Sequence, residues 1–243
     1  MGPKIIFEDE YLLILDKPAG WITNEVETKG ATPTVQDWLK RNFDYSIAKS
    51  AEYRSGIVHR LDKETSGVLV VAKTSNAFQS LQTQFKRREI KKTYIALVHG
   101  EFEPREGEIE APVGRLPWNR ERFGVLPGGR EANTGYKVLN YYSLATDHRS
   151  LFTLGEFFPK TGRTHQIRIH LKYLGHPIVS DEFYAGRKTA RADRKWCPRL
   201  FLHAKSISVR HPEKDTALEF KSELPDGLKK ALSFLVKQNS LVK

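Results

Sequence analysis

The sequence contains a single cysteine, Cys197, among its 243 residues. One thiol excludes an internal disulfide and any zinc site that is built from several cysteines. The chain also lacks an apolar run of the roughly 20 residues that a membrane-spanning helix needs. Its start becomes acidic at Glu8 before a signal-peptide core can form, and Ile6 breaks the pattern for N-myristoylation. These absences predict a soluble, cytoplasmic protein without a membrane anchor.

Sequence motifs for common cofactors are absent as well. The sequence has no phosphate-binding loop and no dinucleotide-binding fingerprint. His165 and His170 are five positions apart, which does not place two metal ligands on one face of a helix. The remaining histidines are scattered along the chain. We therefore expect no metal and no cofactor.

Negative charge is scarce, because 29 Asp and Glu face 40 Lys and Arg, which gives a net charge of +11. A globular protein this basic usually binds a polyanion, and nucleic acid is the commonest one. Basic proteins of the ribosome and of lipid surfaces share the same signature. The charge alone therefore identifies no function.

Three basic segments stand out, at residues 86–92, 113–130 and 185–199. In the third segment six cations face a single acid, Asp193, and Tyr184 and Trp196 lie alongside. The cations are Arg187, Lys188, Arg191, Arg194, Lys195 and Arg199. Cations that neutralise phosphates, beside rings that stack on unpaired bases, suit single-stranded or looped RNA. An ordinary solvated surface is the alternative interpretation of each segment.

Apolar runs and turn residues predict more strands than helices. Strands are expected near residues 11–15, 68–72, 93–98, 135–144, 151–158, 200–210 and 217–222. Because strands and helices rarely alternate one for one, the pattern favours an α+β fold over a doubly wound sheet. No internal repeat, low-complexity linker or break in composition is present. We expect residues 1–243 to form a single domain.

Helices are predicted after the N-cap residues Thr34, Asn76 and Thr164, and around residues 226–237. The helix after Thr164 should end at Gly175 and bury three residues, Ile167, Leu171 and Leu174. Three segments are predicted as irregular: residues 22–33, residues 113–133 (a long loop or a ragged hairpin) and residues 185–199.

Asp62 lies in a polar turn, from His59 to Gly67, directly before the apolar run at 68–72. A carboxylate at the end of a buried strand, flanked by Arg60 and Lys63, is well placed to act as a nucleophile or base. An ordinary turn with a capping aspartate is the alternative interpretation.

Four ordered segments carry a resemblance to a known family. The nonapeptide His59-Arg60-Leu61-Asp62-Lys63-Glu64-Thr65-Ser66-Gly67 resembles the signature of the RluA-type RNA pseudouridine synthases. Residues 16–20 (Asp-Lys-Pro-Ala-Gly), 91–96 (Lys-Lys-Thr-Tyr-Ile-Ala) and 161–171 resemble three further motifs of this family, the last followed by 175–178 and Asp181. Weaker likeness at 202–204 and 211–212 extends the resemblance over almost the whole chain.

The resemblance implies an isomerase that converts uridines within structured RNA, either ribosomal RNA or tRNA, to pseudouridine without a cofactor. It also implies a catalytic domain with a central mixed, mostly antiparallel sheet flanked by helices and loops. Asp62 would be the nucleophile, Tyr94 a ring packed on the target base, and Arg168 the cation paired with Asp62. A guanidinium favours the charged form of a carboxylate in a dry pocket and fixes its orientation. On the predicted helix, Arg168 should lie off the core face.

Further residues are expected to contact RNA. A target base must leave its stack to be reached, and Arg60 matches the arginine that fills the resulting gap in the family. His59, Arg163, His165 and Gln166 are interpreted as site-framing or RNA-backbone residues. Arg191, Arg194 and Lys195 belong to the basic segment that is the leading RNA-binding candidate.

The chain departs from many family members in one respect, since its first predicted catalytic strand begins by residue 11. We therefore expect no separate N-terminal RNA-binding domain, and a monomer is the default state. Two other functions stay open: a non-catalytic RNA-binding or ribosome-assembly protein, and a glycosidase that uses a carboxylate.

Overall fold

The protein is described by a computed structural model that covers residues 2–25, 32–117 and 119–238. The predicted loop at 22–33 therefore lies partly outside the described residues. The chain divides into two compact units. Unit 1 comprises Met1–Lys92 and Ala204–Glu223, and unit 2 comprises Thr93–His203 and Leu224–Lys243. A single catalytic domain over residues 1–243 stays a prediction.

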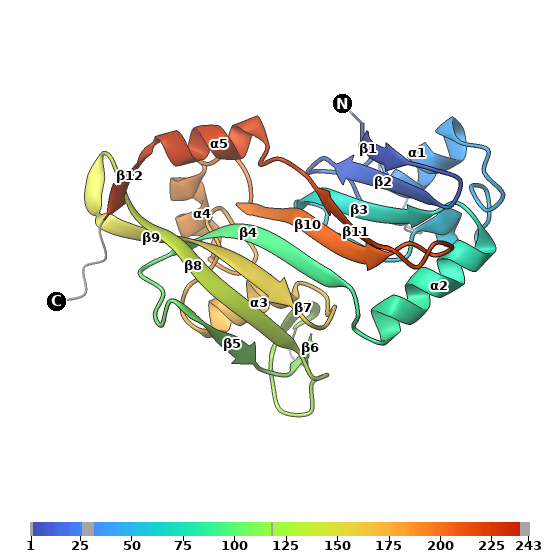
Figure 1. Cartoon of the computed structure of the whole chain (residues 1–243). Coiled ribbons are helices and arrows are strands. Elements are labelled where there is room, and N and C mark those ends of the chain that lie inside the picture. Colours follow the sequence, from blue (N-terminus) through green and yellow to red (C-terminus); the bar gives the residue numbers. More distant parts are fainter. Residues whose placement is uncertain (1, 26–31, 118, 239–243) are drawn as a thin grey trace. The chain divides into compact units, whose positions relative to one another are not determined.

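Unit 1 contains a sheet with two helices (Figure 1). Its strands are β1 (Lys4–Glu8), β2 (Leu12–Lys17), β3 (Ser66–Ala72), most of β10 (Leu202–Arg210), and β11 (Ala217–Lys221). Its helices are α1 (Val35–Asn42) and α2 (Ser75–Lys86), with a short 3₁₀ turn at Arg54–Gly56. The pairs β1–β2, β2–β3 and β10–β11 are antiparallel, and β10 is the neighbour of β3.

The interior strands β2 and β3 of unit 1 each contain a continuous apolar run, which is typical of strands that are covered on both faces. All residues of β3 are buried, and four of the six residues of β2 are buried aliphatics. Helix α2 packs Phe78 and Leu81 into the cluster that holds Val68 and Val70 of β3. Burial of such a side chain contributes about 1.5–3 kcal/mol, so this cluster anchors the start of β3 and the turn before it.

Gly67 lets β3 approach β10 closely. Its backbone has φ +118°, and a Cβ atom at this position would lie 2.2 Å from the carbonyl oxygen of Ala204. Only glycine fits a site that combines a positive φ with direct backbone contact. The last residue of the nonapeptide is therefore set by the packing of two strands.

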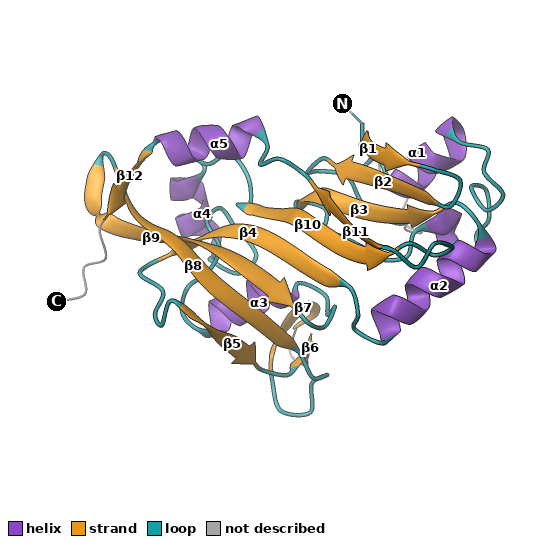
Figure 2. Ribbon diagram, viewed as in Figure 1, coloured by secondary structure: helices purple, strands orange, loops and turns teal. Residues whose placement is uncertain are grey.

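Unit 2 is built on the long antiparallel hairpin β8–β9 (Figure 2). Its strands are β4 (Lys91–His99, starting at the end of unit 1), β5 (Glu106–Glu110), β6 (Val113–Leu116), β7 (Asn119–Val125), β8 (Asn133–Leu144), β9 (Asp147–Pro159) and β12 (Leu235–Gln238). Its helices are α3 (Gln166–Tyr173), α4 (Arg187–Asp193) and α5 (Asp226–Ser233). β9 pairs with β4 and β8, β8 also pairs with β5 and β12, and β6 pairs with β7.

The core of unit 2 lies between this sheet and its helices. Phe102, Phe157 and Phe201 are almost completely buried there, and Leu171 of α3 and Leu228 of α5 pack into the same cluster. The strand-rich units with separate helices confirm the predicted α+β class. None of the described helices is long and apolar enough to span a membrane.

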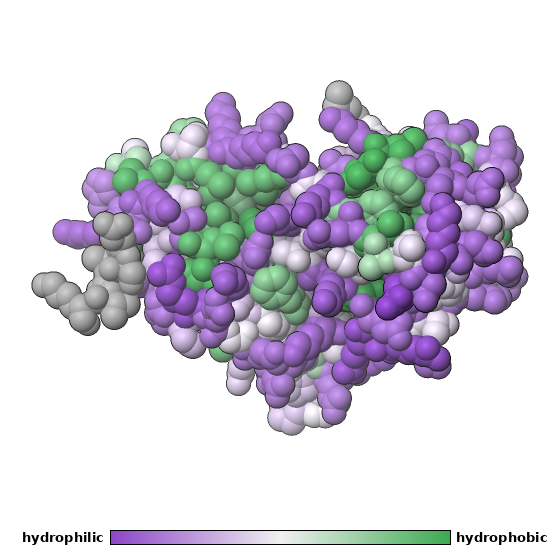
Figure 3. Space-filling model, in the orientation of Figure 1, coloured by the Kyte–Doolittle hydropathy of each residue, from purple (hydrophilic) through white to green (hydrophobic). Residues whose placement is uncertain are grey.

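On the face of the molecule that Figure 3 shows, hydrophilic residues surround several smaller apolar areas. The exposed large apolar side chains among the described residues are Ile5, Ile6, Tyr173, Leu174, Phe234 and Val236. They fall in three pairs along the sequence, and small groups of exposed apolar residues are normal in globular proteins.

Two predicted helix starts differ from the structure. Helix α2 starts at Ser75, and its N-cap is Thr74, whose hydroxyl accepts the Ala77 amide at 3.2 Å; Asn76 is inside the helix. Helix α3 has His165 as its N-cap, with φ 55°, and Thr164 is exposed. Several neighbouring residues can cap a helix, and the path of the entering chain selects among them. The predicted cap Thr34 is confirmed by its 3.0 Å bond from the Asp37 amide.

Two segments differ in type from their prediction: residues 185–199 contain the helix α4, and residues 226–237 divide into α5 and β12. Leu174, predicted to be buried, is exposed at the end of α3. Residues 113–133 contain the hairpin β6–β7, in agreement with one of the two predicted forms. The strands β1, β5 and β12 were not predicted. Each has only four or five residues and is largely exposed, so its pattern is too short to indicate a strand.

Candidate active site

Asp62 lies in unit 1, in the loop that leads into β3. Its backbone carbonyl accepts a hydrogen bond from the Thr65 amide at 3.1 Å, which closes the predicted turn. The Asp62 side chain is partly buried, while Arg60 and Lys63 on either side of it are exposed. The carboxylate therefore stands at the outer end of a buried strand, as the sequence pattern predicts.

His59 is part of the scaffold of this turn. Its Nε2 accepts a hydrogen bond from the Val70 amide at 2.9 Å, and its ring packs 5.0 Å from that of Phe85. Burial, with a smaller contribution from the nearby Lys92 cation, lowers the pKa of His59 to about 3. Burial also lowers the pKa of Lys92 to about 8. The imidazole is therefore neutral at physiological pH, in the form that can accept the Val70 bond.

Arg168 lies on α3 in unit 2 and is only 8% exposed. The expectation that it lies off the core face is wrong, because Gln166 to Leu171 are all buried and α3 packs against β7, β8 and β9. Its Nε and Nη2 donate to Oδ2 and Oδ1 of Asp181, both at 2.8 Å. This bidentate pair satisfies a buried charge and fixes the plane of the guanidinium.

Asp181 is itself held rigidly. It is 1% exposed, and its Oδ1 also accepts the backbone amides of Phe183 and Tyr184 at 3.1 Å each. The Tyr184 ring lies 5.0 Å from the Arg168 guanidinium carbon, a cation–π contact. The aim of Arg168 is thus set by the loop that follows α3 as well as by the helix.

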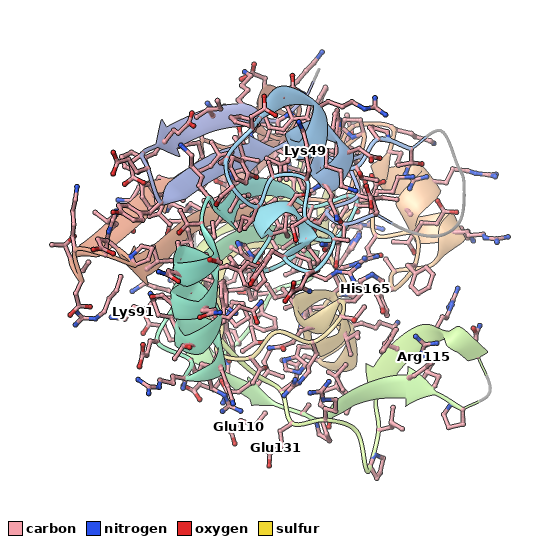
Figure 4. The ribbon with its side chains drawn as sticks, turned by 90° about the vertical axis from the view of Figure 1, so that its right-hand side faces the viewer. Lys49, Lys91, Glu110, Arg115, Glu131 and His165 are labelled. Carbon is pink, nitrogen blue, oxygen red and sulfur yellow. The ribbon has the colours of Figure 1, made fainter. Side chains whose placement is uncertain are left out.

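His165, labelled in Figure 4, lies at the start of α3 and belongs to a cluster of aromatic rings. The Nδ1 of His165 is 2.9 Å from the Tyr184 hydroxyl, and the His165 ring is near those of Phe123 and Phe183. Arg115 and Arg122 of the hairpin β6–β7 stack on Phe123 and Phe183, at 5.1 and 4.9 Å. Rings and guanidinium planes of this kind are the groups that bind unstacked bases.

Tyr94 lies on β4 in unit 2, in register with Phe157 of β9. Its ring is partly buried and packs against the core cluster that includes Ile167 of α3. Tyr94 and α3 therefore belong to the same packed unit. A partly buried tyrosine leaves part of its ring accessible, which a stacking role requires.

Gln166 and Arg163 hold the loop before α3. The buried Gln166 accepts the Thr161 hydroxyl and the Arg163 amide at 2.6 and 3.0 Å, and donates to the carbonyl of Asn133 at 2.9 Å. The Nε of Arg163 donates to the carbonyl of Glu131 at 2.9 Å. For Gln166, a framing role fits this burial and a direct RNA contact does not.

Helix α4 presents the predicted basic segment to solvent. Arg191, Arg194 and Lys195 are exposed, and Arg194 pairs with Glu182 at 2.8 Å. The opposite side of the helix is anchored by the buried Asp193, which accepts the Ser180 amide at 2.8 Å. The anchor leaves the cations on an outward face.

Sequence reasoning did not assign Asp181 and Tyr184 to the site. Asp181 stood at the end of the third matching motif, which was a usable signal. Tyr184 was noted only as a ring beside a basic segment. Their contacts with Arg168 span 13 residues or more along the chain, so a local pattern can indicate Asp181 itself and does not indicate its contact with Arg168.

Known proteins resemble this chain over most of its length. A family described as "RNA pseudouridylate synthase" matches residues 11–173. The ribosomal large subunit pseudouridine synthase D of Nitrosomonas europaea is 40% identical over 235 residues, covering 93% of this chain and 63% of that protein. The ribosomal large subunit pseudouridine synthase C of Vibrio parahaemolyticus is 36% identical over 236 residues, covering 97% and 70%.

A solved structure shares the fold. Human RNA pseudouridylate synthase domain containing 1 superposes with a TM-score of 0.75 at 24% identity, over 100% of this chain and 91% of that one. The family match covers most of the chain and includes Asp62, Tyr94 and Arg168. This chain belongs to the RNA pseudouridylate synthase family.

Proposed function

We propose that this protein is an RNA pseudouridine synthase with Asp62 as its nucleophile. It isomerises a uridine within structured RNA: the bond between N1 of uracil and C1′ of ribose breaks, and C5 is joined to C1′ instead. C5 loses its proton and N1 gains one, so that the product has the composition of the substrate. The observation that carries the proposal is the family match over residues 11–173, which spans the Asp62 turn.

In this proposal each site residue has a distinct role. Asp62 attacks in its ionised form, Arg168 pairs with it in the reacting complex, and Tyr94 packs on the flipped base and assists loss of the C5 proton. Arg60, which is exposed beside Asp62, occupies the gap that the base leaves. The bonds to Asp181 use two of the five N–H groups of Arg168, and they support a fixed aim of its guanidinium. Such fixed positioning is a large source of rate enhancement.

RNA is the proposed partner, held by cations outside the reacting centre. The exposed face of α4 and the hairpin arginines support this assignment, because phosphate contacts supply most RNA affinity and stacked rings hold unpaired bases. The relatives named above are synthases of the large ribosomal subunit. Large-subunit ribosomal RNA is therefore the first substrate to test, and tRNA the second.

Release of tritium from RNA that carries [5-³H]uridine tests the reaction. The wild type should release tritium, and Asp62→Asn should reduce release to background. Asp44→Asn, which removes an exposed carboxylate of unit 1 that pairs with Lys49, should match the wild type. Equal release by wild type and Asp62→Asn would refute Asp62 as nucleophile. Free uracil among the products would indicate a glycosidase instead.

Absence of release from any cellular RNA would favour the non-catalytic RNA-binding function. Mapping pseudouridines by carbodiimide-blocked reverse transcription, with and without the gene, then identifies the RNA and the site. In a deletion strain, full rescue by Asp62→Asn would point to the same non-catalytic function.

The α4 face is tested by reversing Arg191, Arg194 and Lys195 to Glu. RNA binding should weaken, and the slope of log affinity against log salt should flatten by about one for each phosphate that the variant no longer neutralises. The control reverses three exposed lysines of unit 1, namely Lys4, Lys49 and Lys214, and changes the net charge equally. An equal decrease of affinity in both variants would show that only net charge matters.

A further inference from the structure

The turn that carries Asp62 lies directly before β3, and a bond from the Thr65 amide to the Asp62 carbonyl closes it. A nucleophile must be held within a fraction of an ångström of its productive position. The groups that hold the residues on either side of Asp62 therefore bear directly on its chemistry.

Thr23 holds the residue before Asp62. Its hydroxyl donates to the carbonyl of Leu61 at 2.7 Å, and the same oxygen accepts the Leu61 amide at 3.1 Å. Both backbone groups of Leu61 thus depend on one side chain, 38 positions earlier in the chain. Thr23 is 1% exposed and Leu61 is 3% exposed, so water does not replace these bonds.

Lys17 and Gly20 hold the residue after Asp62. The carbonyl of Lys63 accepts the Gly20 amide at 2.8 Å and the Lys17 ammonium at 3.2 Å. The Lys17 side chain is fully buried and also donates to the carbonyls of Pro18 and Trp21, at 3.0 and 2.8 Å. Burying a lysine is costly unless its donors are satisfied, and here it ties two segments of the chain together.

The segment that supplies these groups is itself fixed by helix α1. The amide of Val35 donates to the carbonyl of Ile22 at 2.8 Å, and the amide of Gln36 donates to that of Thr23 at 3.2 Å. These are amides of the first helical turn, which have no partner inside the helix. A rigid element therefore fixes the backbone of Thr23, and Thr23 in turn fixes Leu61.

We infer that Thr23 is a positioning residue for the proposed nucleophile: its hydroxyl, together with Lys17 on the other side, fixes the backbone of the Asp62 turn. This inference rests on the proposed function. Thr23 contacts no reacting atom in it and acts through Leu61. Loss of the hydroxyl frees both backbone groups of Leu61 and lets the carboxylate sample unproductive positions.

The test compares Thr23→Val with Thr23→Ser in the tritium-release assay. Thr23→Val keeps the shape and removes the hydroxyl, so kcat should fall about ten- to hundredfold, while the RNA Kd stays within about twofold of the wild type. Thr23→Ser keeps the oxygen and should restore kcat to within about threefold of the wild type. Should Thr23→Val not fold, Thr23→Ala removes the same hydroxyl and is measured in its place.

Thr153 provides a matched control in unit 2. Its hydroxyl also donates to a carbonyl, that of Gly100 at 2.7 Å, and accepts an amide, that of Phe102 at 3.1 Å. It is equally buried, at 1% exposure. Thr153→Val should lower stability as Thr23→Val does and leave kcat within about twofold of the wild type.

The outcomes separate this inference from the function on which it rests. No release by the wild type would overturn the proposed function and this inference with it. Release by the wild type with an unchanged kcat for Thr23→Val would overturn this inference alone. An equal fall in kcat for the Thr23 and Thr153 variants would also overturn it, because stability would then explain both.

Discussion

Replacing Asp181 by Asn should uncouple Arg168 from its anchor without disturbing the surrounding loop. In the wild type, Asp181 Oδ1 accepts the Arg168 Nη2 and the amides of Phe183 and Tyr184, while Oδ2 accepts the Arg168 Nε at 2.8 Å. Asn keeps an oxygen at the first position and puts an NH₂ group at the second. The amides keep their acceptor, and the Nε–H of Arg168 faces a donor.

The expected cost follows from the burial of this pair. The side chains are 9% and 0% exposed, and removing one charge of a buried pair typically costs 3–5 kcal/mol. Because one acceptor is kept, we expect a loss of about 3 kcal/mol in the free energy of unfolding. In the proposed reaction, the loosened guanidinium should lower kcat about ten- to hundredfold.

Urea denaturation measures the first effect, and tritium release at 25 °C from folded protein measures the second. Asp193→Asn is the control, because Asp193 is also a buried carboxylate of unit 2 that accepts a backbone amide and faces a ring nitrogen, that of His99 at 3.0 Å. The Asp193→Asn variant should have a lower free energy of unfolding and an unchanged kcat. If the two variants lower kcat equally, Asp181 acts through stability alone and does not aim Arg168.

Two further predictions concern the nonapeptide. The pKa of His59 is lowered from 6.5 to about 3 in the folded protein, so the unfolded chain takes up this proton at a higher pH than the folded one. The free energy of unfolding therefore falls as the pH drops below 6.5, and this loss is complete below about pH 3. Between pH 7.5 and 5 the loss in the free energy of unfolding amounts to about 2 kcal/mol. Urea denaturation should show that the stability of His59→Asn depends less on pH than that of the wild type. An equal dependence on pH in the two proteins would contradict this account. Gly67→Ala should lower stability by at least about 2 kcal/mol, because its Cβ would meet the Ala204 carbonyl at 2.2 Å. A thermal scan should show no such loss for Gly162→Ala, where a Cβ meets nothing within 4 Å, and equal melting temperatures for the two variants would refute the clash.

Local patterns determined much of the fold. The apolar runs of β3 and β4 and the cap Thr34 act through contacts within a few residues, so the sequence indicates them directly. Gly175, with φ +85°, ends the last turn of α3 as predicted. The spacing of the four motifs likewise identified the family, and with it the candidates Asp62, Tyr94 and Arg168. Edge strands such as β1, which has five largely exposed residues, give too short a pattern and were missed for that reason.

Tertiary structure alone decided which partner each polar group receives. Whether Arg168 is exposed or buried depends on three strands that pack against α3, and its ion pair depends on where the following loop returns. The Thr23 hydroxyl reaches Leu61 because amides at the start of α1 hold the backbone of Ile22 and Thr23 in place. Such contacts join residues far apart in the chain, and a polar side chain carries no sign of its distant partner. The sequence by itself therefore identifies the family and the candidate residues, and the packing of distant segments decides how those residues are held.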